Sequence, residues 1–206
     1  MKHFSLETLV FAISLVFVCC KQENSVSNAQ DKEAAVTNEN HSNTHAQGFT
    51  IDSFTSYKLL TITKAFPGSK EKYVYALIND QTSSQIEREL KNDSKINHVL
   101  KTPLESIIVT STTHIPSLEM LGVSESLIGF PGLDYISSPL SRKRISEKKI
   151  KEVGRNEALN TEQIIELSPE AVISFGVEGE NKTLNTLTRA QIPVLYNGDW
   201  VETHPL

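Results

Sequence analysis

The feature that most constrains the fold is an alternation of short apolar runs with helical patterns between residues 104 and 206. Ser106 to Thr110 is short and rich in β-branched residues, as expected for a buried strand of a parallel sheet. Ser126 to Phe130, Ala171 to Phe175 and Pro193 to Tyr196 are similar runs. Strands that alternate with helices predict an α/β fold with a parallel sheet and right-handed crossovers.

The segments between these runs carry helix signals. Ile115 to Leu121 is expected to be a helix whose Leu118 and Leu121 face the sheet. Asn160 and Asn181 each precede an apolar helical pattern, where an asparagine side chain can accept a hydrogen bond from the first turn. A basic run from Arg142 to Lys151 is interpreted as a solvated helix face.

Open parallel sheets bind ligands at the carboxyl ends of their strands. That rule selects three loops, namely Ser111 to His114, Phe175 to Gly179 and Asn197 to Trp200. The hydroxyls of Thr112 and Thr113 and the imidazole of His114 are candidates to hydrogen-bond a ligand. Capping of the next helix by Thr113 and a structural role for His114 remain open as alternatives.

Aromatic residues supply the second set of candidates, because aromatic faces commonly line binding clefts. Trp200 is the only tryptophan of the chain and lies in one of the three selected loops. Tyr135 and Phe130 are further candidates for ligand contact. Packing roles remain the alternative for all three side chains.

The stretch from Ser106 to Asn197 resembles the N-terminal lobe of the periplasmic substrate-binding proteins that serve ABC importers of iron siderophores, haem and vitamin B12. The matching features stand in order along the chain: Ser111-Thr112-Thr113-His114, Leu121-Gly122-Val123, Leu127-Ile128-Gly129-Phe130, Val153-Gly154, Asn160 with Ile164, Ile165 and Leu167, Ser168-Pro169-Glu170, and Ile192-Pro193-Val194. The resemblance implies a Rossmann-like lobe of a class III periplasmic binding protein.

The same resemblance implies a non-catalytic receptor that works with an ABC transporter permease. Its ligand would be a ferric siderophore, haem or cobalamin, held between two lobes. It also implies that Glu180 pairs with arginines of the permease, although a carboxylate near a helix start has an ordinary electrostatic explanation as well. The second lobe is missing from residues 104–206, and we expect the sequence to be truncated.

The N-terminal half divides into three predicted parts. Residues 1–20 contain a short apolar run followed by the only two cysteines, Cys19 and Cys20, which predicts a lipoprotein signal peptide with Cys20 as the acylated residue. A plain secretory signal is the alternative. Residues 21–48 are polar and predict a disordered tether. Residues 49–103 are expected to form a β-hairpin, with a turn at Pro67 to Ser69, and a connecting segment.

Together these features predict a protein of the cell envelope that is anchored to a membrane by lipid and exposed in the periplasm or on the cell surface. The mildly acidic balance, with a net charge of −5, argues against a nucleic-acid partner. We find no nucleophile elbow or phosphate loop, so no enzyme activity, cofactor or resident metal is expected. A surface lipoprotein that uses one α/β lobe as a protein-interaction module is the alternative function.

Overall fold

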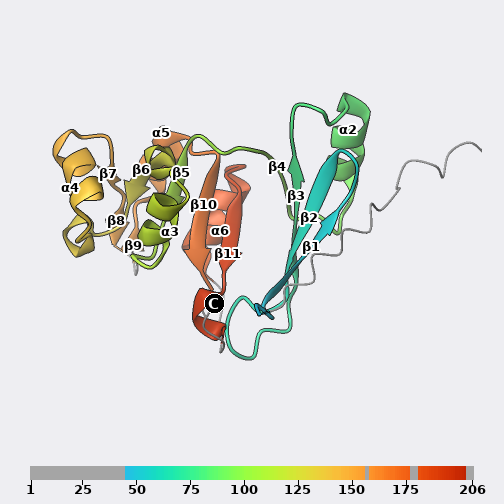
Figure 1. Ribbon diagram of the computed structural model, residues 1–206, viewed down its shortest axis with the longest axis horizontal. Coiled ribbons are helices and arrows are strands. Elements are labelled where there is room, and N and C mark those ends of the chain that lie inside the picture. Colours follow the sequence, from blue (N-terminus) through green and yellow to red (C-terminus); the bar gives the residue numbers. More distant parts are fainter. Residues whose placement is uncertain (1–44, 156–157, 177–180, 203–206) are drawn as a thin grey trace, which may run out of the picture. The chain divides into compact units, whose positions relative to one another are not determined.

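The computed structural model describes residues 45–155, 158–176 and 181–202 of the chain. The predicted signal peptide, Cys20, nearly all of the predicted tether and Glu180 lie outside the described residues. The described chain forms a four-stranded sheet, a five-stranded sheet and a two-stranded ribbon (Figure 1).

The five-stranded sheet holds the predicted strand–helix alternation. Its strands are β5 (Ile107–Val109), β6 (Leu127–Phe130), β7 (Lys151–Glu152), β10 (Ala171–Phe175) and β11 (Val194–Asn197). In space they follow the order β11-β10-β5-β6-β7, and all neighbouring pairs are parallel. Counted from β7, this is third, second, first, fourth and fifth along the chain, the order of a doubly wound sheet. The predicted α/β fold with a Rossmann-like parallel sheet is confirmed.

Helices cover both faces of this sheet. They are α3 (His114–Met120), α4 (Pro139–Ser146), α5 (Thr161–Leu167) and α6 (Lys182–Arg189). Ile115 of α3 and Ile145 of α4 pack in one core cluster with Ile107 of β5. Ile164 of α5 packs with Ile108 of β5 in a second cluster. Since neighbouring residues of a strand point to opposite faces, the two helix pairs lie on opposite sides of β5.

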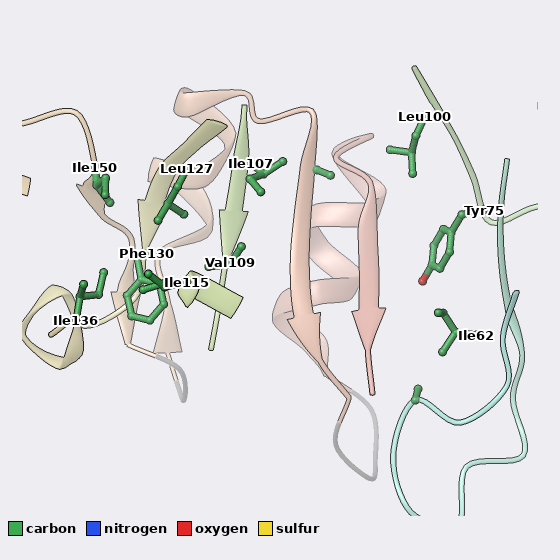
Figure 2. Packing of buried hydrophobic residues seen from close by; sticks show 12 residues of the cluster. Ile62, Tyr75, Leu100, Ile107, Val109, Ile115, Leu127, Phe130, Ile136 and Ile150 are labelled. Carbon is green, nitrogen blue, oxygen red and sulfur yellow. The ribbon is translucent and has the colours of Figure 1, made fainter. Parts of the chain in front are cut away.

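Figure 2 shows the first cluster from close by, with Val109 of β5, Ile115 of α3 and Phe130 of β6 directed into the same space. The second cluster takes Leu184 and Leu187 from the apolar face of α6. Both sides of the sheet are therefore buried, which explains why its strands read as continuous apolar runs rather than as alternating ones.

The predicted helix starts are confirmed. The Asn160 side chain accepts a hydrogen bond from the Gln163 amide over 3.1 Å, and Asn181 accepts one from the Leu184 amide over 3.0 Å. The prediction for Leu121 is wrong. The α3 helix ends at Met120, so Leu121 turns away from the sheet and is largely exposed.

The basic run is only partly a solvated face. Lys143, Lys148 and Lys149 are exposed, as expected, but Arg144 on α4 is buried. Its guanidinium donates hydrogen bonds to the backbone carbonyls of Ser124 and Glu125. Five fixed N–H donors suit this use, which ties α4 to the turn before β6.

The segment before the parallel sheet holds more than a hairpin. It contains β1 (Phe49–Ser53), β2 (Tyr57–Ile62), β3 (Tyr73–Ile78), α2 (Ser84–Asn92) and β4 (His98–Lys101). The predicted hairpin corresponds to β2 and β3, and its turn is closed by a 3.0 Å hydrogen bond from the Ser69 amide to the Phe66 carbonyl. The β1 strand pairs antiparallel with β2, and β4 pairs parallel with β3 after α2 crosses over.

The two sheets share a core. Ile62, Tyr75 and Leu100 of the four-stranded sheet belong to the same buried cluster as Ile107 and Leu127. The Tyr196 amide of β11 donates a 3.2 Å hydrogen bond to the Tyr75 hydroxyl. The segment that precedes the lobe is thus part of its hydrophobic interior.

Smaller elements complete the described chain. They are the ribbon of β8 (Gly154–Arg155) and β9 (Ala158–Leu159) and the short 3-10 helices η1 (Ser124–Ser126), η2 (Leu133–Tyr135) and η3 (Asp199–Val201). Across residues 45–155, 158–176 and 181–202, none of the helices has the length and apolar character that crossing a bilayer requires.

The α5 helix offers a test of this packing with a control in the adjacent residue. Ile164 is 0% exposed and Ile165 is 41% exposed. Ile164→Ala should lower the free energy of unfolding by about 2–5 kcal/mol, because it removes buried methyl groups and leaves a cavity. Ile165→Ala should cost less than about 1 kcal/mol. Urea denaturation of both variants checks this, and equal losses would contradict the described orientation of α5.

Candidate functional site

The reversal of strand order places a switch point between β5 and β10. The chain first proceeds outward from β5 to β6 and β7, and then returns to β10 and β11 on the other side. In doubly wound sheets ligands bind outside the carboxyl ends of the strands at such a point. We call the carboxyl ends of β5, β6, β10 and β11, with the loops that follow them, the ligand edge.

A hydrogen bond joins two of the predicted loops across this edge. The Thr113 hydroxyl, after β5, donates to the Asp199 carboxylate, after β11, over 2.9 Å. The Ser111 hydroxyl lies 2.8 Å from that of Thr113. Because β5 and β11 flank β10, these side chains bridge the end of β10. Thr112 is exposed beside them.

Thr113 does not cap α3 with its side chain, although it stands at the N-cap position. Its hydroxyl is used in the bridge to Asp199 instead. Below the bridge, the buried hydroxyls of Thr110 and Ser174 are 3.2 Å apart. Two buried hydroxyl groups therefore lie between the bridge and the apolar interior of the sheet.

His114 begins α3 and is only 5% exposed. Neither ring nitrogen has a hydrogen-bond partner among the described residues. Burial lowers the pKa of the imidazole, and the nearby negative charge of Asp199 partly opposes this effect. Burial therefore favours the neutral form of His114, and its side chain is part of the packed interior.

Two of the three candidate aromatic residues are exposed at the ligand edge. Trp200 lies in η3 after β11 and is 53% exposed, and Tyr135 lies in η2 after β6 and is 72% exposed. Three strand spacings separate β11 from β6, or roughly 14 Å across the sheet. Both side chains are therefore candidates to contact the same large ligand.

Phe130 is placed differently from the other two. It is the last residue of β6, and its ring is fully buried in the first core cluster. The prediction of ligand contact is corrected for this residue, because a side chain in that position supports the sheet from inside. The packing alternative describes it correctly.

Two features of the edge were not predicted from the sequence. One is the carboxylate of Asp199, which follows Asn197 and Gly198; the Asn197 side chain accepts a 3.1 Å hydrogen bond from the Asp199 amide. This turn is a recognisable signal at the end of a strand. The other is the backbone of Lys64 and Ala65, which lies against Gly198 and Gly176 at the ends of β11 and β10.

The remaining predicted residues of the edge, 177–179, belong to the undescribed stretch before Asn181. Within residues 45–155, 158–176 and 181–202, no group of three or more His, Cys, Asp or Glu side chains is arranged to hold a metal ion.

Comparison with known proteins gives matches among solved structures. No protein-family model matches the chain, and no curated protein matches it. The chain is similar to the periplasmic haem-binding protein RhuT from Roseiflexus sp. RS-1, at 22% identity over 45% of this chain and 33% of that one, with a TM-score of 0.37.

Two further solved structures are similar over the same fraction of their length. The periplasmic haem-binding protein HutB of Vibrio cholerae is 21% identical over 44% of this chain, with a TM-score of 0.34. The petrobactin-binding protein YclQ of Bacillus subtilis is 17% identical over 48% of this chain, with a TM-score of 0.36. The chain spans about a third of the length of each of the three proteins, 33% in every case.

The buried His114 predicts a pH dependence of stability. Its pKa is lowered from the ordinary value of 6.5, so between 6.5 and the lowered value the unfolded chain binds more protons than the folded chain. Stability should fall as the pH drops through this range, by at most about 1.4 kcal/mol per pH unit. Burial also lowers the pKa of His98, which adds a slope of the same sign.

We expect His114→Gln to flatten this dependence. Urea midpoints measured between about pH 7.5 and pH 5.5 should change less in His114→Gln than in the wild type. The slopes are compared rather than the absolute stabilities, because the substitution also alters packing. A His114→Gln slope equal to that of the wild type would contradict the neutral, buried imidazole.

Proposed function

We propose that this chain is the ligand-capturing lobe of a substrate-binding lipoprotein that delivers an iron chelate, haem or a corrinoid to an ABC importer. The observation that carries the proposal is that two exposed aromatic residues, Trp200 and Tyr135, both lie on the carboxyl edge of one doubly wound sheet. Aromatic faces of this kind suit large ligands with flat or apolar surfaces.

The polar groups between them suit the same ligands. Thr112 is exposed between the two aromatic positions, and the Thr113–Asp199 bridge supplies a hydroxyl and a carboxylate with remaining hydrogen-bonding capacity. An iron chelate or a macrocycle brings its own metal ligands, so such a receptor recognises hydroxyl, carboxylate or amide groups on the ligand's rim. The motifs that stand in order from Ser111 to Val194 also support a substrate-binding protein of an ABC importer.

The proposal extends to the parts outside the described residues. Cys20 would be acylated and would hold the protein at a membrane of the cell envelope, and residues 21–48 would serve as a tether. Glu180 would pair with arginines of the permease. These roles rest on the sequence pattern and on the family resemblance.

Calorimetric titration of the full chain with haem, a ferric siderophore and cobalamin tests the ligand class. One of the three should bind saturably. Trp200→Ala and Tyr135→Ala should each weaken that binding by about tenfold or more, because each removes a large apolar contact. Calorimetry is needed because Trp200 is the only tryptophan, so its removal also abolishes the fluorescence signal.

Met120→Ala is the matched control for these variants. Met120 is exposed at the end of α3, and α3 runs back from the ligand edge toward the amino ends of the strands. The substitution removes exposed apolar surface of similar kind but should leave affinity unchanged. Equal losses in Met120→Ala and Trp200→Ala, or no saturable binding of any of the three ligands, would contradict the proposal and favour a protein-interaction role.

A further inference from the structure

The β2–β3 connection reaches the ligand edge and meets it backbone to backbone. A Cβ atom added to Gly176 would overlap the carbonyl oxygen of Ala65, and one added to Gly198 would overlap the carbonyl oxygen of Lys64. Gly176 directly follows β10, and Gly198 directly follows β11. Only glycine permits so close an approach of two backbones. The ends of both strands are therefore covered by another part of the same chain.

Burial of its apolar side chains holds this cover, residues 64–66, in place. Ala65 has no exposed surface and belongs to the core cluster shared by the two sheets, and Phe66 packs against that cluster. Tyr75, on the strand that follows the connection, is also fully buried. Its hydroxyl accepts a hydrogen bond from the Tyr196 amide of β11. Opening the cover would expose these buried groups to water. Segments that open easily bury few apolar groups, so this cover is expected to stay closed.

Hydrogen bonds hold the cover from the side as well. The amides of Thr63 and Lys64 donate to the Gly48 carbonyl over 2.7 and 3.1 Å. The amides of Gln47 and Gly48 in turn donate to the Glu202 carboxylate over 2.9 and 2.6 Å. Because Glu202 directly follows η3, these bonds tie the cover to the helix that carries Asp199 and Trp200.

We propose that residues 64–66 form a permanent wall of the ligand site. The wall occupies the β10–β11 half of the edge, so a ligand can bind only over the β5–β6 half. The open half then consists of the exposed Thr112 after β5 and Tyr135 after β6. Trp200 lies at its boundary, because its neighbour Asp199 in η3 reaches across the end of β10 to Thr113. This inference rests on the proposed function for the identity of the ligand. The position of the wall itself is independent of it.

The wall determines which ligands fit. In an open edge a ligand could lie across the switch point and contact the ends of both β5 and β10. Here backbone of Lys64 and Ala65 lies against the ends of β10 and β11, and the Thr113–Asp199 hydrogen bond spans the end of β10. A bound ligand must therefore approach from the α3 and η2 side and rest one flank against the wall.

Limited trypsin digestion of the full chain tests the wall, since the same connection contains its own control sites. Lys64, Lys70 and Lys72 all have exposed side chains, but only Lys64 precedes a fully buried residue. Cleavage requires local unfolding around the bond. We expect fragments that end at Lys70 or Lys72 to accumulate well before any that ends at Lys64, as followed by mass spectrometry.

Gly198→Ala should remove this protection. The φ angle of Gly198 is −97°, which alanine also adopts, so the substitution acts mainly through its overlap with the Lys64 carbonyl oxygen and only secondarily through a 3.3 Å contact with Val201. Gly122→Ala is the control, because a Cβ there meets nothing within 4 Å although its φ of +70° imposes strain. Early cleavage at Lys64 is expected in Gly198→Ala and not in Gly122→Ala.

Three results would overturn the wall: early cleavage at Lys64 in the wild type, no effect of Gly198→Ala, or loss of Lys64 protection when the wild type is saturated with its ligand. The last result would describe a lid that moves on binding. Failure of haem, ferric siderophore and cobalamin to bind would count against the proposed function only. The digestion of the ligand-free wild type and of Gly198→Ala would still decide whether the wall is present.

Discussion

The pairing of β5 with β10 is the interaction on which the rest of the structure depends. Three parallel pairs, from Ala171 with Ile107 to Ile173 with Val109, join the two halves of the sheet. The strands β6 and β7 extend the sheet on one side of β5, and β10 and β11 extend it on the other. The β5–β10 contact is therefore the switch point of the sheet, with α3 and α4 on one face and α5 and α6 on the other. Because Ile107 and Ile108 face different clusters, a shift of one residue in this pairing would exchange the two cores.

Much of this arrangement could be predicted from local signals. The apolar runs around Ile108 and Val172 indicated buried parallel strands, and Asn160 and Asn181 marked helix starts that the structure confirms. Leu121 was misplaced because helical periodicity does not show where a short helix ends. The burial of Arg144 was not predicted, because the sequence does not show that its guanidinium bonds two backbone carbonyl groups in the folded chain.

The site could be predicted less completely, because it is assembled across large separations in sequence. Strand ends identified Thr113 and Trp200, but the partner of Thr113 is Asp199, 86 residues away. Lys64 and Ala65 contact Gly198 and Gly176 through their backbone. Such contacts cannot be predicted from the pattern of side chains in the sequence. Small residues at the ends of two strands were visible in the sequence, yet nothing local indicated what would lie against them.

The hydrogen bonds from Gln47 and Gly48 to Glu202 have a consequence for the connectivity of the fold. They hold the first and last parts of the described chain side by side, so a short linker could join residue 45 to residue 202 with little added loop entropy. New ends could then be opened at the exposed turn around Pro67 and Gly68, beyond the buried Ala65. The part of the fold between residues 45 and 202 is therefore suited to circular permutation, which would preserve both sheets while changing the order in which they are synthesised.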